Sequence, residues 1–203
     1  MPAALDLGNN SADVAAIATR VLSGAPEVGA TRLVCIDGPA GSGKTSLATA
    51  LVGVLEPLVG EVTVVHGDDL DEGWAVVAGE EDRALAFGVL ARRLAASLLT
   101  PWARGEHGEH PVWDWYSGAR TAPRVLAAPA VAVLEGVGLA AAPLRAQATL
   151  SIWVSAGPRT RLDRVLARDG DDVREEMLSW QVDEQRWFDA DATRAGCDLR
   201  LAT

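Results

Sequence analysis

The segment Gly38–Thr45 constrains the fold of this chain more than any other feature. Its sequence, GPAGSGKT, fits the phosphate-binding pattern G-x-x-x-x-G-K-[ST] at every fixed position. An apolar run over 32–37 precedes it and predicts a buried strand, and Leu47, Leu51 and Leu55 follow at helical spacing. In a strand–loop–helix unit, such a loop turns its backbone N–H groups towards a phosphate.

The only lysine of the chain, Lys44, lies in this motif, and every other basic residue except histidine is arginine. A compact ammonium can lie against β- and γ-phosphates inside a tight loop, whereas a planar guanidinium is too broad for it. We therefore expect the loop to bind nucleotide phosphates, with the Thr45 hydroxyl on Mg²⁺. The residues predicted to bind the nucleotide are Gly38, Ala40, Gly41, Ser42, Gly43, Lys44, Thr45 and Ser46.

Composition limits the remaining possibilities. With 203 residues, 49% of them hydrophobic, the chain can form one well-buried α/β domain over 1–203. The net charge of −10 argues against a nucleic-acid partner. Cys35 and Cys197 are isolated and predict neither a disulfide framework nor a metal site. We expect a cytoplasmic protein without a membrane partner, because a secretory leader and an uninterrupted apolar span are both absent from the sequence. The sequence does not indicate an oligomeric state.

Apolar strands alternate with helical segments, which predicts a three-layer α/β/α fold with a parallel sheet of about five strands. The expected strands are 32–37, 61–66, 131–135, 149–154 and 197–201, and the expected helices are 10–23, 44–55, 80–99, 157–169 and 173–190. Asp172 and Glu175 resemble a capping box for the last helix. Residues 100–124 have no clear period.

Three carboxylates follow predicted strands, at the edge where parallel sheets bind ligands. Asp68 and Asp69 come after the strand 61–66, where one of them could accept a proton from a hydroxyl or hold Mg²⁺ through water. A solvated acidic loop is the alternative. Glu135 ends the apolar run 131–134 and resembles a carboxylate that positions the water ligands of Mg²⁺. The alternative is a structural role, in which Glu135 ends the strand and caps the turn 136–138.

Arg161, Arg164 and Arg168 are spaced three and four residues apart, which predicts that they share one helical face. Guanidinium groups on one face suit phosphoryl oxygens that gain charge during transfer. The alternative is a solvated basic face that pairs with Asp163 and Asp169.

Aromatic residues gather between the long helix and the next strand. Trp113, Asp114 and Trp115 would form an apolar wall with one carboxylate, which could stack a planar base or close over a sugar. Alternatively, these rings and that of Trp102 fill the core beneath the loop, and the sequence favours neither role. His107 and His110 have neither the register nor the second pair that a metal site requires.

With these residues placed, the chain resembles the uridine kinase family of P-loop kinases, and within it actinobacterial uridine kinase-like ATP-binding proteins. The resemblance runs from about Arg32 to Leu201. It rests on the segments Gly38–Thr45, Asp68-Asp69-Leu70, Trp113-Asp114-Trp115 with Arg120, Glu135-Gly136 and Arg161–Asp169. The family's aspartate–serine–phenylalanine–tyrosine motif is Asp68-Asp69-Leu70-Asp71 here, and its tyrosine–aspartate–phenylalanine motif has tryptophan at both aromatic positions.

The resemblance implies a kinase that uses ATP and Mg²⁺ to phosphorylate a hydroxyl of a small, nucleoside-like acceptor. It implies that Asp68 is the base, with Asp69 in reserve, and that Lys44 and the arginines of a helical lid over about 157–172 hold the phosphates. It also implies that Trp113, Asp114, Trp115 and Arg120 line the acceptor pocket, and that Thr45 and Glu135 hold the metal.

Two other functions stay open at this point. A GTP-dependent switch is disfavoured, because its Asn-Lys-x-Asp motif needs a second lysine. An ATP-binding regulatory module without an acceptor fits the same motif. So does a kinase of a sugar, a coenzyme precursor or an antibiotic.

Overall fold

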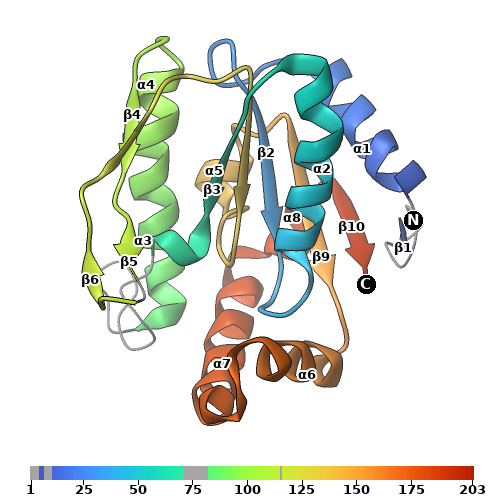
Figure 1. The fold of residues 1–203 in the computed structure, drawn as a ribbon, viewed down its shortest axis with the longest axis vertical. Coiled ribbons are helices and arrows are strands. Elements are labelled where there is room, and N and C mark those ends of the chain that lie inside the picture. The colour runs from blue at the N-terminus through green and yellow to red at the C-terminus, as the bar shows by residue number, and fades with distance from the viewer. Residues whose placement is uncertain (1–4, 7–10, 71–81, 115) are drawn as a thin grey trace.

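One parallel sheet forms the centre of the protein (Figure 1). The computed structural model describes residues 5–6, 11–70, 82–114 and 116–203. The strand order is β1-β10-β9-β2-β8-β3, and all pairs are parallel. The five predicted strands are present, and β1 adds a short edge strand. The bounds are β1 Leu5–Asp6, β2 Arg32–Asp37, β3 Val62–His66, β8 Val131–Glu135, β9 Leu150–Ser155 and β10 Leu199–Ala202.

Helices cover both faces of this sheet, as the three-layer prediction requires. Side chains of β2 alternate between two hydrophobic clusters, because successive residues of a strand point to opposite faces. Leu33 and Cys35 pack with α3, α5 and α7, whereas Val34 and Ile36 pack with α1 and α2. The bounds of these helices are α1 Ser11–Ser23, α2 Lys44–Val59, α3 Arg83–Leu94, α5 Ala142–Arg145 and α7 Arg174–Asp191. A short α8 spans Thr193–Gly196.

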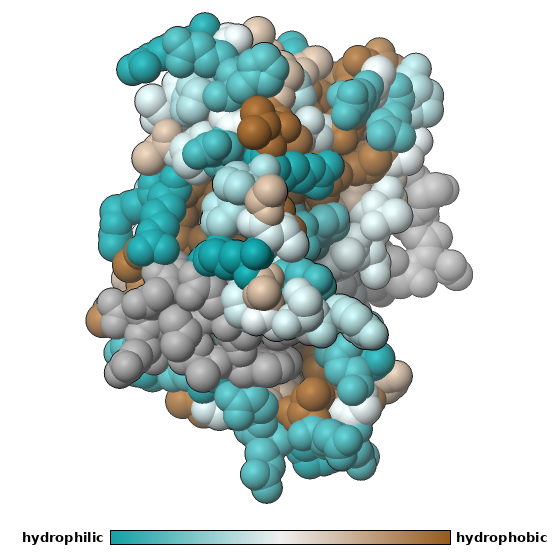
Figure 2. Space-filling model, turned by 60° about the vertical axis from the view of Figure 1, so that its left-hand side comes forward, coloured by the Kyte–Doolittle hydropathy of each residue, from teal (hydrophilic) through white to brown (hydrophobic). Residues whose placement is uncertain are grey.

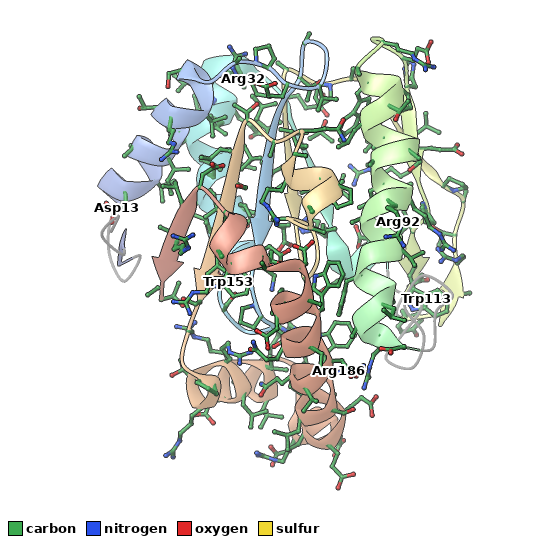
Figure 3. The ribbon with its side chains drawn as sticks, turned by 180° about the vertical axis from the view of Figure 1, so that it is seen from behind. Asp13, Arg32, Arg92, Trp113, Trp153 and Arg186 are labelled. Carbon is green, nitrogen blue, oxygen red and sulfur yellow. The ribbon has the colours of Figure 1, made fainter. Side chains whose placement is uncertain are left out.

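The rings of the core show how the C-terminal helix joins the sheet. Trp153 of β9 and Phe188 of α7 meet edge to face, with ring centroids 4.7 Å apart. Trp153 is labelled in Figure 3, which views the protein from behind. The contact joins α7 to the core cluster, and its edge-to-face geometry is favourable for aromatic rings.

Two helical predictions need correction. The expected helix over 80–99 begins at Arg83, where Asp82 accepts a hydrogen bond from the N–H of Ala84, and it continues as a π-helix, Ala95–Leu99, into the short α4, Thr100–Trp102. The capping box before α7 is absent. A 3₁₀ turn, Asp171–Val173, leads into α7 instead, and Val173 at the N-cap has no side chain that could accept a bond.

Residues 100–124 contain order that the sequence pattern did not reveal. Two small antiparallel pairs lie beside α3, β4 (Gly108–His110) with β7 (Arg124–Leu126) and β5 (Trp113–Asp114) with β6 (Ala119–Arg120). Trp102 is fully buried and donates its indole N–H to the carbonyl of Leu126, so this ring belongs to the core. Figure 2 turns this side of the molecule forward, and hydrophilic side chains surround smaller hydrophobic areas there.

Among the described residues, one helical stretch is long and apolar enough to be compared with a membrane span. It runs over Arg83–Trp102, and half of it is buried inside the protein. The stretch includes Arg92 and Arg93, and its apolar side chains, such as Phe87 and Leu94, belong to the main core cluster. Core helices of soluble proteins pass the same test, so this stretch is weak evidence for a membrane.

The carboxyl ends of β2, β3 and β8 converge on one edge of the sheet, which is the ligand-binding edge of this class of fold. Helix α6, Pro158–Asp169, lies beyond that edge at the bottom of Figure 1. It ends at Gly170, which has a φ of 94° and no neighbouring atom within 4 Å of the position of a Cβ. The predicted lid over 157–172 therefore corresponds to α6 and the turn that follows it.

Candidate active site

The loop between β2 and α2 requires glycine at two positions where other elements approach it closely. Gly38 and Gly41 have φ angles of 145° and 76°. A Cβ at Gly38 would lie 2.0 Å from the carbonyl oxygen of Val154, and one at Gly41 would lie 2.4 Å from that of Arg161. Any other residue at either position would displace the end of β9 or helix α6.

Lys44 begins α2, and its ammonium lies against the loop itself. Its Nζ donates to the carbonyl oxygens of Gly38, at 2.8 Å, and Pro39, at 3.2 Å, and the residue is 8% exposed. An anion at this helix start would meet both the ammonium and the positive end of the helix dipole. The predicted nucleotide-binding residues Gly38, Ala40, Gly41, Ser42, Gly43, Lys44, Thr45 and Ser46 all lie in this loop and the first turn of α2.

Glu135, at the end of β8, connects the loop to the neighbouring strand. Its two carboxylate oxygens lie 3.2 and 3.3 Å from the donating hydroxyl of Thr45, and its Oε1 lies 2.6 Å from Nδ1 of His66. The hydrogen bond to Glu135 is the main cause that raises the pKa of His66. Sequence analysis predicted that Thr45 and Glu135 would meet but missed His66. The signal was available, because His66 ends β3 directly beside Glu135 in register.

The donor set at this point fits magnesium. The hydroxyl of Thr45 and the carboxylate of Glu135 are the oxygen donors that Mg²⁺ prefers. Within the described ranges, no group of three or more His, Cys, Asp and Glu side chains could hold a metal ion, and this includes His107 and His110. The site therefore suits an ion that takes most of its ligands from nucleotide phosphates and water.

Asp68 lies in the 3₁₀ turn Gly67–Asp69 that follows β3. Its side chain reaches solvent, yet the surrounding protein reduces its hydration, and this desolvation raises the pKa of Asp68. The positive charges of Lys44 and Arg168 lower that pKa and the negative charge of Glu135 raises it further. Asp68 therefore lies within electrostatic range of three other predicted site residues, Lys44, Glu135 and Arg168.

The arginines of α6 differ in their surroundings, so they do not form one uniformly solvated face, and their predicted contact with a transferred phosphoryl group stays a prediction. Arg161 is buried and forms an ion pair with Glu184, at 2.7 Å. Arg164 is exposed and donates to the carbonyl of Gly41 at 3.3 Å. Arg168 forms two hydrogen bonds of 2.7 Å with Asp169. Arg161 and Arg164 turn towards the loop, because α6 packs its first two turns against it.

The hairpin β5–β6 holds the residues predicted to bind the acceptor. Asp114 uses its carboxylate within the hairpin, where it accepts from the backbone N–H of Tyr116 at 2.9 Å and from the hydroxyl of Ser117 at 2.7 Å. The bond from Ser117 is the first cause of a lowered pKa for Asp114. Trp113 is half-buried and labelled in Figure 3 beside α3. Trp115 lies outside the described residues.

Arg120 borders a small cavity between α3 and the hairpin. The cavity has a volume of about 40 Å³ and is lined by Leu70, Leu90, Arg93, Leu94, Ser97, Pro111 and Arg120. The strand β5 also contacts the turn that carries Asp68. The structure thus places β5, which carries Trp113, against the turn of the predicted base and Arg120 beside the cavity that Leu70 also lines, while Asp114 is engaged in its own turn.

Asp37 is a site residue that sequence analysis missed. Its carboxylate is fully buried and accepts hydrogen bonds from the N–H groups of Gly38 (2.7 Å), Gly138 (3.1 Å) and Ala140 (2.7 Å). It therefore ties the phosphate-binding loop to the loop after β8. Desolvation by burial raises the pKa of Asp37 to about 6. An acidic residue at the end of an apolar strand, directly before the glycine motif, was the available signal.

Replacing Asp37 with alanine is expected to lower the free energy of unfolding by about 2–4 kcal/mol at neutral pH, because three buried N–H groups lose their acceptor. A raised pKa means that the folded state binds the proton more tightly than the unfolded state. Proton binding therefore adds to the contribution of Asp37: the added stability is present in full below about pH 4 and is lost as the pH rises through about 6, which leaves the contribution of the hydrogen bonds at neutral pH.

Urea unfolding of both proteins between pH 4 and pH 7.5 tests this expectation. The stability difference between wild type and Asp37→Ala should increase by about 2–3 kcal/mol from pH 7.5 to pH 4, since each unit of pKa difference corresponds to about 1.4 kcal/mol and most of the difference is realised at pH 4. Asp163→Ala, at a side chain that is 68% exposed, is the control. A stability difference that falls on acidification would show that the pKa of Asp37 is not raised in the folded state.

Comparisons with known proteins extend this description. No protein-family model matches the chain, and no curated protein matches it significantly. A solved structure called a "possible uridine kinase", from Bacillus stearothermophilus, aligns with a TM-score of 0.65 at 18% identity over 93% of this chain and 96% of the other. A "putative fructose transport system kinase" from Silicibacter sp. TM1040 aligns with a TM-score of 0.63 at 21% identity over 92% and 98%.

Both alignments cover nearly the whole of each chain. At such low identities, this similarity concerns the fold. The parallel sheet, the glycine-rich loop and both structural neighbours agree that the chain has the fold of the uridine kinase-like P-loop kinases.

Proposed function

We propose that this protein is a kinase that transfers the γ-phosphoryl group of ATP to a hydroxyl of a small, nucleoside-like molecule. One observation carries the proposal: Lys44 and the Thr45–Glu135 pair lie at one edge of the sheet, and Asp68, in the turn after β3, is near enough for the charges of Lys44 and Glu135 to shift its pKa. That set combines a phosphate cradle, oxygen donors for Mg²⁺ and a candidate base, which phosphoryl transfer to an alcohol requires.

Each residue has a role that its position supports. The loop amides and Lys44 bind the β- and γ-phosphates, and Mg²⁺ held near Thr45 and Glu135 would neutralise phosphate charge. Asp68 accepts the proton of the acceptor hydroxyl as its oxygen bonds to the γ-phosphorus and the bond to the bridging β–γ oxygen breaks, which leaves ADP. Arg168, near Asp68, can stabilise the charge on the transferred group.

The acceptor is proposed to bind between the turn after β3 and the hairpin β5–β6, where Trp113 and Arg120 lie. The aromatic ring favours a flat or sugar-like molecule. The proposal includes a cytoplasmic location, in keeping with an acidic chain whose longest apolar helix packs into the core. It includes neither a nucleic-acid nor a membrane partner.

Acceptor-stimulated ADP release tests the function directly. ATP, Mg²⁺ and the protein are incubated with a panel of nucleosides, sugars and other small alcohols, and ADP is measured with and without each acceptor. The expected result is a strong increase with one chemical class and a phosphorylated acceptor in the mass spectrum. A sugar, coenzyme precursor or antibiotic as the acceptor would revise the substrate class. Slow hydrolysis that no acceptor stimulates would instead indicate an ATP-binding regulatory module.

A further inference from the structure

One peptide group of the phosphate-binding loop is held by a buried ion pair. The N–H of Ala40 donates to Oε2 of Glu184 at 2.8 Å, and Oε1 of Glu184 accepts from Nη1 of Arg161 at 2.7 Å. The same Nη1 lies 3.4 Å from the carbonyl oxygen of Ala40. Glu184 is 1% exposed and Arg161 is 9% exposed. Ions buried this deeply need hydrogen bonds to offset lost hydration, and here the loop supplies them.

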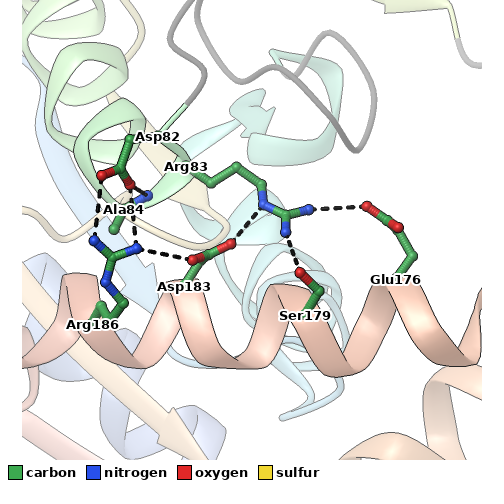
Figure 4. Close-up of polar contacts among 7 residues, drawn as sticks. All are labelled: Asp82, Arg83, Ala84, Glu176, Ser179, Asp183 and Arg186. Carbon is green, nitrogen blue, oxygen red and sulfur yellow. Dashed lines mark hydrogen bonds and ion pairs between the residues drawn. The ribbon is translucent and has the colours of Figure 1, made fainter.

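Helix α7, which carries Glu184, is fastened elsewhere by contacts of its own. Arg83 of α3 donates to Asp183 at 2.8 Å, to Glu176 at 3.1 Å and to Ser179 at 2.6 Å (Figure 4). Farther along α7, Asp191 pairs with Arg145 of α5 at 3.1 Å. Because these bonds already fix the helix, the carboxylate of Glu184 is not needed to attach α7 to the fold.

The rest of the loop is held in the same manner. Arg164 donates to the carbonyl of Gly41 at 3.3 Å and to the hydroxyl of Thr203 at 2.8 Å. That hydroxyl in turn donates to the carbonyl of Ser42 at 2.9 Å. Three successive carbonyls, from residue 40 to residue 42, thus accept bonds from other elements. The Ser42 amide also donates within the loop, to the carbonyl of Pro39 at 3.1 Å. These bonds fix the peptide planes of the loop, and with them the directions of its amides. Glu184 is the only described partner of the Ala40 amide.

We propose that Glu184 is a positioning residue for nucleotide binding: it fixes the Ala40 peptide, and through it the loop amides that meet the β-phosphate, while Arg161 orients Glu184 and does not contact the transferred phosphoryl group. The inference rests on the proposed binding of a nucleotide by this loop. It goes further by assigning a role to a carboxylate remote in sequence, and by changing the role expected for Arg161.

The double variant Arg161→Met/Glu184→Met separates positioning from stability. A single Glu184→Met change leaves a buried guanidinium without its partner, so its urea midpoint should fall clearly. Replacing both charges with apolar side chains of similar size should restore most of that midpoint, because apolar pairs often replace buried ion pairs without a loss of stability. The Ala40 amide, however, lacks its acceptor in both proteins.

Calorimetric titration with ADP and Mg²⁺ gives the deciding measurement and needs no acceptor. We expect the double variant to bind ADP about tenfold more weakly than wild type, or weaker still, although its stability has recovered. Amide hydrogen exchange over residues 38–43 should also be faster in the nucleotide-free double variant. Glu176→Met is the matched control, because Glu176 lies on the same helix, bonds to Arg83 and is half-exposed, and it should leave both readouts unchanged.

Wild-type affinity and wild-type exchange in the double variant would overturn the proposal. If the double variant does not fold, Glu184→Gln replaces it. Glutamine has one acceptor oxygen where Glu184 uses two, and the guanidinium of Arg161 should take that oxygen, so that the side-chain NH2 faces the Ala40 N–H and ADP binding weakens several-fold. Wild-type ADP affinity in Glu184→Gln would then count against the positioning role. If the wild-type protein itself binds no ADP, the proposed function fails, and loop exchange still decides whether Glu184 positions residues 38–43.

Discussion

Replacing Lys44 with alanine is expected to reduce acceptor-dependent ADP release by roughly 10²- to 10³-fold, the range seen when one preorganised donor to a developing charge is removed. Lys44 is 8% exposed and its ammonium lies within 3.2 Å of two loop carbonyls, so it is already in place before a nucleotide arrives. Water that fills the space left by the side chain carries no positive charge. Initial rates at saturating ATP measure the effect.

Lys44→Arg is the informative companion. It keeps the charge but places a broad guanidinium in a loop whose glycines touch Val154 and Arg161, so its loss should approach that of the alanine variant. An unfolding curve for each variant confirms that the fold persists. If Lys44→Arg retained most of the wild-type rate, the loop would be more open than its contacts indicate, and the argument from the lone lysine would be wrong.

Asp68→Asn should lower turnover by roughly 10²- to 10⁴-fold, the range for loss of a general base. The reason is that the amide cannot take the proton of the acceptor hydroxyl, although its shape is nearly the same. Because desolvation raises the pKa of Asp68, the wild-type rate should fall on acidification at a pH above the usual range of an aspartate. A pH–rate profile of kcat/KM should show this acidic limb in the wild type and lack it in the variant.

Asp69→Asn is the matched control for that experiment, since Asp69 is in the same turn and has the same charge. It should keep most of the wild-type rate together with the acidic limb. A large loss with Asp69→Asn and little loss with Asp68→Asn would exchange the roles of the two residues. Full turnover in both variants would show that neither aspartate acts as the general base.

Much of the fold could be predicted from the sequence, because its signals are local. The strand of Arg32–Asp37 is bounded by a motif with fixed spacing, and Val131–Glu135 is a continuous apolar run. Both were predicted with the bounds that the structure has. The meeting of Thr45 with Glu135 was also predictable, since the carboxyl ends of neighbouring parallel strands share one edge.

The parts that escaped prediction depend on contacts between segments distant in sequence. Nothing near Glu184 marks it as a partner of Ala40, 144 residues away. Helical spacing placed Arg161 and Arg164 on one face but could not reveal that the packing of α6 against the loop buries the first of them. The hairpin strands are only two or three residues long, which is too short for an alternating pattern to stand out.

The attachment of α7 has a mechanical consequence. Its bonds to α3, α5 and the phosphate-binding loop are spread from Glu176 to Asp191, so the helix is held in place along most of its length. The later turns of α6, beyond Arg164, make no such bonds to the loop among the described residues, and Gly170 has open space around it. Val165 is still buried in the core, so residues 166–169, which end at Gly170, are the part of α6 that is least held against α7 and the loop.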